Sequence, residues 1–292
     1  MFTQFFGNYL LNNRYVTAPQ IIEAIQAKNK TRLKLGVLAI DAGYMTAAQV
    51  EEVHQRQMFE DKRIGDLAVE MGFLTEAQVQ ELLNNQKTGY LLLGQALVDA
   101  GHMTNEQFEQ AIANYKEKYK IQDDMEAQSD DKVVAMIEDL CDFSYDDSRI
   151  YSQYVVLLLK NLVRFVGDDF TLLDADDSVK KMPYASITQG IRGEFDSDMA
   201  IVFDDKDAMI KFGCRFSNEE FGDDEMEYIE AAACDFINIH NGLFTVNVSN
   251  ERNLELTLTP PDVCNDGYGI EGEVIVFSVQ YTFGVIRFII TK

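Results

Sequence analysis

The apolar and polar residues in the N-terminal part of the chain follow one pattern four times. The segments RYVTAPQ, GYMTAAQ, GFLTEAQ and GHMTNEQ begin at residues 14, 43, 72 and 101, a constant spacing of 29 residues. In each copy a Thr is followed three residues later by a Gln, the capping-box arrangement in which each side chain bonds the backbone N–H of the other residue. The pattern therefore predicts helices that begin just after Thr17, Thr46, Thr75 and Thr104.

The residue three positions before each Thr predicts the end of a preceding, shorter helix. Gly43, Gly72 and Gly101 stand at this position, where a helix often ends in a left-handed glycine. The first copy has Arg14 instead, and terminal repeats are often atypical. A short helix, a tight turn and a longer helix are too small to bury their own apolar face. We therefore expect an all-α helical module of four packed 29-residue units over residues 1–118.

The pattern changes at the end of this module. Residues 118–131, KYKIQDDMEAQSDD, lose the helical period and are rich in acidic residues, which is typical of a linker. Residues 133–143 could form a short amphipathic helix, because their apolar residues fall on one face. We assign residues 119–148 to an acidic linker that leads into a second domain.

Helical and strand patterns are mixed in the second domain, residues 149–292. Residues 149–167 predict a buried helix that ends at Gly167, and residues 223–242 predict a helix that ends at Gly242. Two-residue alternation and β-branched residues predict strands in three segments, residues 197–205, 253–260 and 272–292. The combination predicts an α+β domain with an antiparallel sheet.

Charge is distributed unevenly between the two halves. The net charge is −24, yet residues 1–122 hold 12 Lys and Arg against 14 Asp and Glu, whereas residues 123–292 hold 13 against 35. Such an acidic half would repel the phosphates of a nucleic acid, so we expect no nucleic-acid partner. A protein partner or a cationic site agrees better with this charge.

The cysteines and the apolar segments indicate the compartment. None of the four cysteines belongs to a CxxC pair, which is typical of buried thiols in a reducing compartment; they are Cys141, Cys214, Cys234 and Cys264. The N-terminal residues have neither the basic region nor the cleavage-type site of a signal peptide. No apolar run approaches the ~20 residues of a membrane span. We expect a cytoplasmic protein without membrane insertion.

No metal site of the protein's own is expected. The segment DADDS at residues 174–178 resembles the start of an EF-hand loop, but Val179 stands where Gly is required and Ala185 where the last Glu is required. The three histidines and the scattered cysteines form no zinc pattern. We therefore predict neither a bound metal nor an intrinsic cofactor.

Two of the repeats resemble a nucleotide-binding module. Residues 34–57, KLGVLAIDAGYMTAAQVEEVHQRQ, and residues 62–86, KRIGDLAVEMGFLTEAQVQELLNNQ, are similar to the paired 24-residue motifs in the N-terminal domain of type II secretion and pilus ATPases, the MshEN class. Paired motifs of that class bind cyclic di-GMP. The resemblance implies ligand contacts from Lys34, Gly36, Gln57, Arg63, Gly65 and Gln86.

The first of these motifs departs from the family at Lys34, where the family has Arg. A guanidinium stacks on a guanine and donates a planar fork of hydrogen bonds, whereas an ammonium does neither. The two outer repeats lack the Arg and the Gln of this set, because Phe5 and Leu92 stand at the Arg position and Lys28 and Tyr115 at the Gln position. The module is therefore expected either to bind cyclic di-GMP or to serve only as a helical scaffold or docking repeat.

The predicted helix at residues 223–242 contains two polar residues that share one face. Asp235 and Asn238 are three positions apart, and the small residues 231–233 beside them would let another surface approach closely. Pro260 follows Asn238 after 21 intervening residues, in the segment LTLTPPDV. This arrangement resembles the motif of the CheC/CheX/FliY family of chemotaxis phosphatases, and the resemblance extends over residues 150–292. The chain has one such pair with this spacing to a Pro, as CheX-like members do.

The resemblance implies an activity and a partner. The activity is dephosphorylation of the aspartyl phosphate of a CheY-like response regulator. Asn238 would orient the attacking water, and Asp235 would pair with a Lys of the receiver domain. The receiver would supply Mg²⁺, so no cofactor of the protein's own is required. CheX-like members pair through their sheets, so residues 149–292 are expected to form a homodimer.

Alternatives stay open for both the residues and the function. The family most often has Glu in place of Asp235, and the shorter Asp reduces the reach of the carboxylate. Asp235 and Asn238 could also be ordinary solvated positions of an amphipathic helix. The competing function is a non-enzymatic signalling adaptor whose repeats bind cyclic di-GMP or a motor or pilus component.

Overall fold

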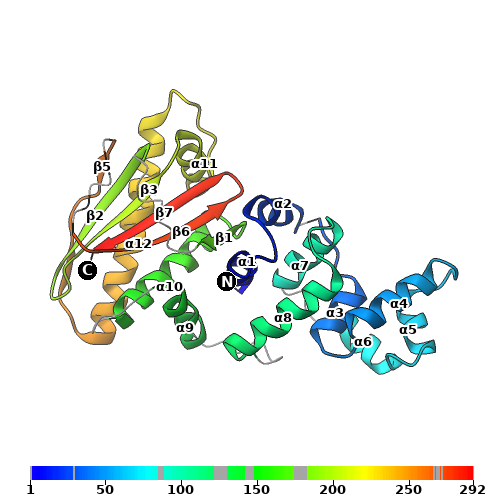
Figure 1. Ribbon diagram of the computed structural model, residues 1–292. Coiled ribbons are helices and arrows are strands. Elements are labelled where there is room, and N and C mark those ends of the chain that lie inside the picture. Colours follow the sequence, from blue (N-terminus) through cyan, green and yellow to red (C-terminus); the bar gives the residue numbers. More distant parts are fainter. Residues whose placement is uncertain are drawn as a thin grey trace. The chain divides into compact units, whose positions relative to one another are not determined.

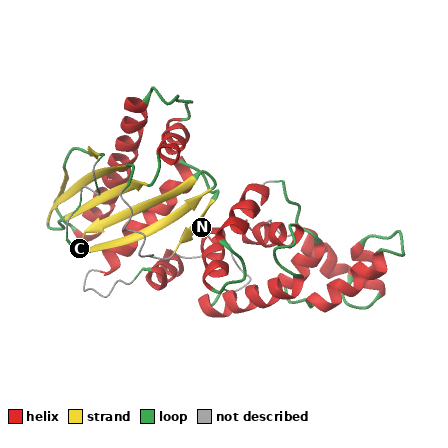
Figure 2. Ribbon diagram, turned by 45° about the horizontal axis from the view of Figure 1, so that its top comes forward, coloured by secondary structure: helices red, strands yellow, loops and turns green. Residues whose placement is uncertain are grey.

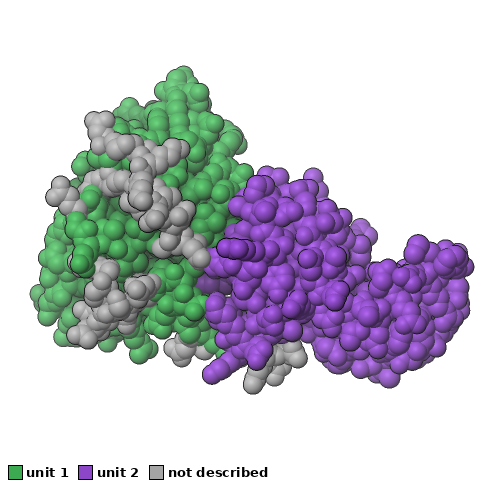
Figure 3. Space-filling view, in the orientation of Figure 1, with its two compact units in different colours: residues 1, 128–292 green, residues 2–127 purple. Residues whose placement is uncertain are grey.

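The chain divides into two compact units, residues 2–127 and residues 128–292, with Met1 grouped with the second (Figure 3). The computed structural model describes residues 2–28, 30–84, 89–121, 130–141, 148–173, 183–265, 267, 270 and 272–291. Among these residues no helix is both long enough and apolar enough to cross a membrane.

The first unit consists of the helix pairs that the repeats predict (Figure 1). In chain order its helices are α1 (Phe2–Asn12), α2 (Ala18–Lys28), α3 (Leu35–Asp41), α4 (Ala47–Gln57), α5 (Ile64–Glu70), α6 (Glu76–Asn84), α7 (Gly89–Asp99) and α8 (Asn105–Tyr119). Helices of different repeats pack on one another, with α2 against α7 and α3 against both α6 and α8. The four units therefore share their apolar faces.

The predicted helix starts are confirmed in each of the four repeats. The backbone N–H of Thr46 donates to Oε1 of Gln49 at 2.8 Å, and the N–H of Gln49 donates to Oγ1 of Thr46 at 3.3 Å. The same reciprocal pair forms at Thr75 and at Thr104. At Thr17 the N–H donates to Gln20. The helix starts therefore follow from contacts within four residues of the chain.

The turn before each cap has the left-handed backbone that the glycines predict. The φ angles are +68° at Gly43, +75° at Gly72 and +71° at Gly101. Arg14, at the equivalent position of the first repeat, has a φ of +56°. This conformation costs a residue with a Cβ about 1–2 kcal/mol relative to glycine. The first repeat thus keeps the same turn without the residue best suited to it.

The second unit is an antiparallel sheet with helices, which confirms the α+β fold class (Figure 2). Its helices are α9 (Asp130–Leu140), α10 (Ser148–Phe165), α11 (Lys206–Ser217) and α12 (Met226–Arg252). Its strands are β1 (Phe170–Leu173), β2 (Ala185–Gly193), β3 (Ser197–Phe203), β4 (Leu256–Leu258), β5 (Asp262–Cys264), β6 (Val274–Tyr281) and β7 (Gly284–Thr291). The strand order is β1-β6-β7-β3-β2-β4, and β5 also pairs with β2.

The core of this unit joins the sheet to α11 and α12. Phe203 of β3 contacts Phe212 of α11 with ring centroids 5.4 Å apart, and Phe212 contacts Phe236 of α12 at 5.1 Å. All three side chains are at most 1% exposed. Edge-to-face pairs of buried aromatic rings stabilise a fixed geometry beyond their area burial. The middle of α12 is therefore held firmly on the sheet.

Two features of this unit differ from the sequence prediction. Helix α12 does not end at Gly242 but continues to Arg252 and is followed by Asn253 with a φ of +56°. Phe244 and Val248, beyond the glycine, are 1% and 2% exposed, so their burial outweighs the ~1 kcal/mol that a helical glycine costs. Four elements were not predicted, namely β1, β2, β5 and α11. Helix α9, within the expected linker, agrees with the short amphipathic helix predicted at residues 133–143, and it packs against α10.

Candidate functional site

Asp235 and Asn238 lie together on the exposed side of α12. Both side chains are exposed, whereas Phe236 and Ile237 between them are each 1% exposed and point into the core. The helical period of 3.6 residues places positions three apart on one face, so the two polar groups project in nearly the same direction. The pair is therefore accessible to a partner and carried by a helix that the core holds in place.

The carboxamide of Asn238 is fixed from below by a residue of the sheet. Nε2 of Gln189, on β2, donates a hydrogen bond of 2.8 Å to Oδ1 of Asn238. Gln189 is only 2% exposed, and its Nε2 also donates to the carbonyl oxygen of Thr259 at 2.9 Å. A side chain held by a buried donor keeps its orientation better than one that bonds only to water. Asn238 is thus less free than its exposure suggests.

The segment around Pro260 reaches the same place. Thr259 and Pro260 connect β4 to β5, and Pro260 is exposed. The N–H of Thr259 donates to the carbonyl of Gly190 at 2.9 Å, and the N–H of Gly190 donates to Oγ1 of Thr259 at 2.8 Å. Gln189 therefore links α12 to the Pro260 segment, and the two separated parts of the predicted motif meet at β2.

The small residues beside the pair are not all available to a partner. Ala231 is exposed, but Ala232 is 7% and Ala233 0% exposed, so these two face the core. The interpretation of all three as a contact surface is therefore wrong for two of them. Their small side chains instead let α12 pack closely within its own domain.

The surroundings of the pair are negatively charged. The pKa of the Cys234 thiol, next in sequence to Asp235, is raised by partial burial and by the nearby carboxylates of Asp235, Glu230 and Asp262. A thiol whose pKa is raised stays protonated at neutral pH and is a weak nucleophile. The local negative field therefore favours an approaching cation, and the nearest thiol stays protonated.

Three residues around the pair escaped the sequence analysis. Gln189, Asn241 and Tyr154 are buried and form hydrogen bonds to one another's side chains. One signal was available for Asn241, which lies three positions after Asn238 and so falls near it on the helix. Gln189 is 49 positions away from Asn238, on a strand that was not predicted, and the sequence gives no signal for it.

The residues expected to contact cyclic di-GMP differ in their exposure and in their hydrogen-bond partners. Nζ of Lys34 donates to Oδ1 of Asp99 at 2.6 Å, and the Lys34 backbone N–H donates to Gln95 of α7. Nε2 of Gln57 donates to the carbonyl of Lys62 at 2.9 Å. Arg63 is exposed at the start of α5, and Gln86 lies outside the described residues. Gln95 and Asp99 of the fourth repeat therefore already bond Lys34 at the start of the first motif.

Gly36 and Gly65 have a packing role in the structure. A Cβ at Gly36 would lie 2.6 Å from Cγ1 of Val50, and a Cβ at Gly65 would lie 3.1 Å from Cγ1 of Val79. A Cβ at the equivalent Gly94 would lie 2.3 Å from Cε2 of Phe108. These glycines let the short helix of each repeat approach the long one. Their presence is therefore explained without a ligand, and nucleotide binding stays a prediction.

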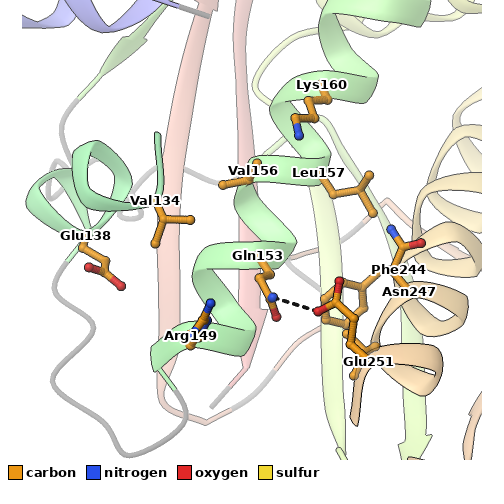
Figure 4. Close-up of a pocket in the computed structure, with 11 residues that line it drawn as sticks. Val134, Glu138, Arg149, Gln153, Val156, Leu157, Lys160, Phe244, Asn247 and Glu251 are labelled. Atoms are coloured by element: carbon orange, nitrogen blue, oxygen red, sulfur yellow. Dashed lines mark hydrogen bonds between the residues drawn. The ribbon is translucent and has the colours of Figure 1, made fainter. Parts of the chain in front are cut away.

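A separate hollow lies between α9, α10 and α12 (Figure 4). Its volume is about 430 Å³, and Nε2 of Gln153 donates to Oε2 of Glu251 across it at 3.0 Å. Its lining mixes the cationic Arg149 and Lys160 with acidic residues and contains neither Asp235 nor Asn238. Over the described residues, no three His, Cys, Asp or Glu side chains are grouped to hold a metal ion.

Comparison with known proteins gives similarities to solved structures alone. No family model matches the sequence, and no curated protein matches it. The C-terminal half is similar in structure to the chemotaxis protein CheX from Vibrio vulnificus, at 14% identity and a TM-score of 0.41, over 49% of this chain and 98% of that one. It is similar to CheX from Desulfovibrio desulfuricans, at 16% identity and a TM-score of 0.39, over 49% and 97%.

A third similar structure is the CheX–CheY–BeF₃–Mg²⁺ complex from Borrelia burgdorferi, at 15% identity and a TM-score of 0.39, over 49% of this chain and 96% of that one. The structural neighbours of this half are thus chemotaxis proteins of the CheX and CheC type. Because these sequence identities are low, the roles of Asp235 and Asn238 are inferred from the residues that surround them in this chain.

Proposed function

We propose that residues 128–292 bind a phosphorylated receiver domain of the CheY type and accelerate hydrolysis of its aspartyl phosphate. One observation carries the proposal. Asp235 and Asn238 share an exposed face of α12, and Oδ1 of Asn238 is held by Gln189 at 2.8 Å. An exposed amide that is also fixed in direction is suited to position a water molecule on a docked partner.

Asn238 would act on the attacking water. Hydrolysis of an aspartyl phosphate requires a water placed in line with the phosphorus and opposite the leaving carboxylate. Because Oδ1 of Asn238 is engaged by Gln189, its Nδ2 group is directed toward solvent and donates a hydrogen bond to the water oxygen. The contribution of Asn238 is therefore positional, and no bond to the protein is formed or broken.

Asp235 would hold the receiver in place. A carboxylate on the same exposed face pairs with an ammonium of the partner, which is the kind of charge-assisted contact that fixes geometry. Glu230 and Asp262 add negative charge close to this position. The receiver itself supplies Mg²⁺, and Cys234 with its raised pKa plays no nucleophilic part. The protein adds an oriented amide to a site that the receiver largely provides.

Apolar residues on the same helix extend the contact surface. Ile239, Leu243 and Val246 are 42%, 40% and 57% exposed and lie beyond Asn238 along α12. Gly242 lies among them, and a Cβ there would meet no atom of the chain within 4 Å. Exposed apolar residues that adjoin a polar pair are typical of a protein interaction site. This strip of α12 would pack against the receiver.

The test of this function is the rate of phosphate release from a phosphorylated CheY-like receiver in Mg²⁺, with and without the full chain. The proposal predicts acceleration that saturates with protein concentration. Binding of the receiver is measured separately by calorimetry. Binding without acceleration would establish the non-enzymatic adaptor instead, and the absence of both would remove the receiver as a partner.

We also propose a homodimer formed through the C-terminal unit. The strand order ends in β1 on one side and β4 on the other, and an edge strand presents unpaired backbone N–H and C=O groups that a second copy can bond. Sedimentation of the full chain at micromolar concentration is expected to give twice the chain mass of 33.2 kDa. A monomer at that concentration would contradict this proposal without touching the phosphatase site.

A further inference from the structure

A chain of buried side-chain amides lies beneath Asn238. The hydroxyl of Tyr154 on α10 donates to Oδ1 of Asn241 at 2.9 Å, and Nδ2 of Asn241 donates to Oε1 of Gln189 at 2.9 Å. Gln189 in turn donates to Oδ1 of Asn238. Tyr154 is 3% exposed, Asn241 0% and Gln189 2%. This series of hydrogen bonds therefore runs from the core to the exposed Asn238, and its first three members are shielded from bulk water.

Gln189 stands where a strand of this kind carries an apolar side chain. Its neighbours on the same face of β2, Ile187 and Ile191, are both 0% exposed. A buried amide is costly unless its polar atoms are hydrogen-bonded. At Gln189 the requirement is met, because Oε1 accepts one bond and Nε2 donates two. The polar side chain is thus tied to the three groups that surround it.

One of those groups decides the orientation of every amide in this series of hydrogen bonds. A hydroxyl can donate or accept, so Tyr154 alone would permit the opposite orientation of all three amides. The main-chain carbonyl of Thr259, 2.9 Å from the Gln189 side chain, can only accept. It therefore requires Nε2 of Gln189 on its side, and the same Nε2 then faces Oδ1 of Asn238. Nδ2 of Asn238 is consequently turned outward.

We propose that Gln189 is a positioning residue that makes Asn238 present its NH₂ group, and not its carbonyl, to the attacking water. This inference rests on the proposed phosphatase function. An outward N–H donor occupies one lone pair of the water oxygen and leaves the other for attack on phosphorus. An outward carbonyl would instead accept a hydrogen bond from the water and leave both lone pairs of the water oxygen unengaged, which restricts the attacking lone pair less. The Thr259 carbonyl thus decides which end of the Asn238 amide faces outward.

The test combines a variant with a measurement on the unaltered protein. Gln189→Met keeps the length of the side chain and removes its hydrogen bonds. It is expected to lower kcat for receiver dephosphorylation about 10- to 100-fold, with KM changed less than about threefold, because docking is intact and the amide is free to turn. The matched control is Gln280→Met on β6, where Nε2 of Gln280 donates to the carbonyl of the adjacent Tyr281. This control should behave as the unaltered protein.

The measurement on the unaltered protein is the exchange of side-chain amide protons with solvent, followed by NMR. Both protons of Gln189 Nε2 are donated and should exchange slowly, whereas those of Asn238 should exchange at the rate of a free amide. Protected Asn238 protons would show the opposite polarity and overturn the inference, as would a Gln189→Met kcat within about threefold of the unaltered protein. If the unaltered chain accelerates nothing, the proposed function itself fails, and the positioning role fails with it.

Discussion

Nε2 of Gln189 lies 2.8 Å from Oδ1 of Asn238, across the boundary between the sheet and the long helix α12. This bond joins a fully buried strand position to the exposed end of the candidate site. It explains how an amide on the surface can have a defined direction. It also makes the site sensitive to changes that a partner never touches.

The carboxylate of Asp235 is expected to govern docking and not the chemical step. Asp235→Ala should therefore raise KM for the phosphorylated receiver at least about tenfold, whereas kcat falls much less. Asp235→Glu should keep or increase kcat/KM, because the longer side chain extends the reach of the carboxylate. Steady-state kinetics with the full chain measures both. An unchanged KM for Asp235→Ala would contradict the assigned contact.

Gly242 offers a prediction about stability. A glycine inside a helix costs about 0.5–1 kcal/mol relative to alanine, and a Cβ at Gly242 meets no atom within 4 Å. Gly242→Ala should therefore raise the free energy of unfolding by about that amount in urea titration. The control is the helical Gly213 of α11, where a Cβ would lie 3.1 Å from Ile229. An equal gain from Gly213→Ala would contradict the packing explanation.

His240 predicts a dependence of stability on pH. Burial lowers the pKa of its imidazole from 6.5 to about 3. Between these two values the unfolded chain binds a proton that the folded chain does not, so the free energy of unfolding falls as the pH is lowered through this window. The slope due to this group is at most about 1.4 kcal/mol per pH unit.

The measurement compares chemical unfolding of the unaltered protein and His240→Phe from pH 7.5 to pH 4. The ring of Phe can keep the contacts that His240 makes with Tyr154 and Phe236. The difference between the two proteins should level off toward pH 7.5 and change steadily as the pH falls through 6.5. A difference that stays constant over the whole range would show that His240 titrates equally in both states.

The repeats carry a prediction about cyclic di-GMP. If residues 34–86 bind it, Arg63→Ala should abolish the heat of binding in calorimetry, and Lys34→Arg should tighten binding by restoring a planar, forked donor. Arg56→Ala is the control, because Arg56 is paired with Glu60 at 2.7 Å and is not part of the predicted contacts. The absence of heat for both the unaltered chain and Lys34→Arg would leave the module as a scaffold.

Local contacts made much of the fold predictable from the sequence. The Thr and Gln of each cap are three residues apart, so the four helix starts depend on no distant part of the chain. The same is true of the shared face of Asp235 and Asn238. The helix end predicted at Gly242 is wrong because the burial of residues beyond it, such as Phe244, outweighs the local signal of a glycine. Tertiary contacts decide the end of that helix.

The support beneath the site could not be predicted for a related reason. Gln189 lies on a strand whose sequence, ASITQGIRG, shows no clear two-residue alternation because both of its faces are largely buried. Its partner Asn238 is 49 positions later, and Thr259 is a further 21. Only the folded sheet brings the three together. The sequence thus located the exposed pair but not the buried group that orients it.

The most direct test of the account is the rate of receiver dephosphorylation by Asn238→Ala, compared with Asn247→Ala, which removes another exposed Asn of the same helix. The account predicts that Asn238→Ala loses about 100-fold or more in kcat while still binding the phosphorylated receiver, and that Asn247→Ala keeps full activity. An Asn238→Ala protein that dephosphorylates the receiver as fast as the unaltered chain would contradict the proposed mechanism.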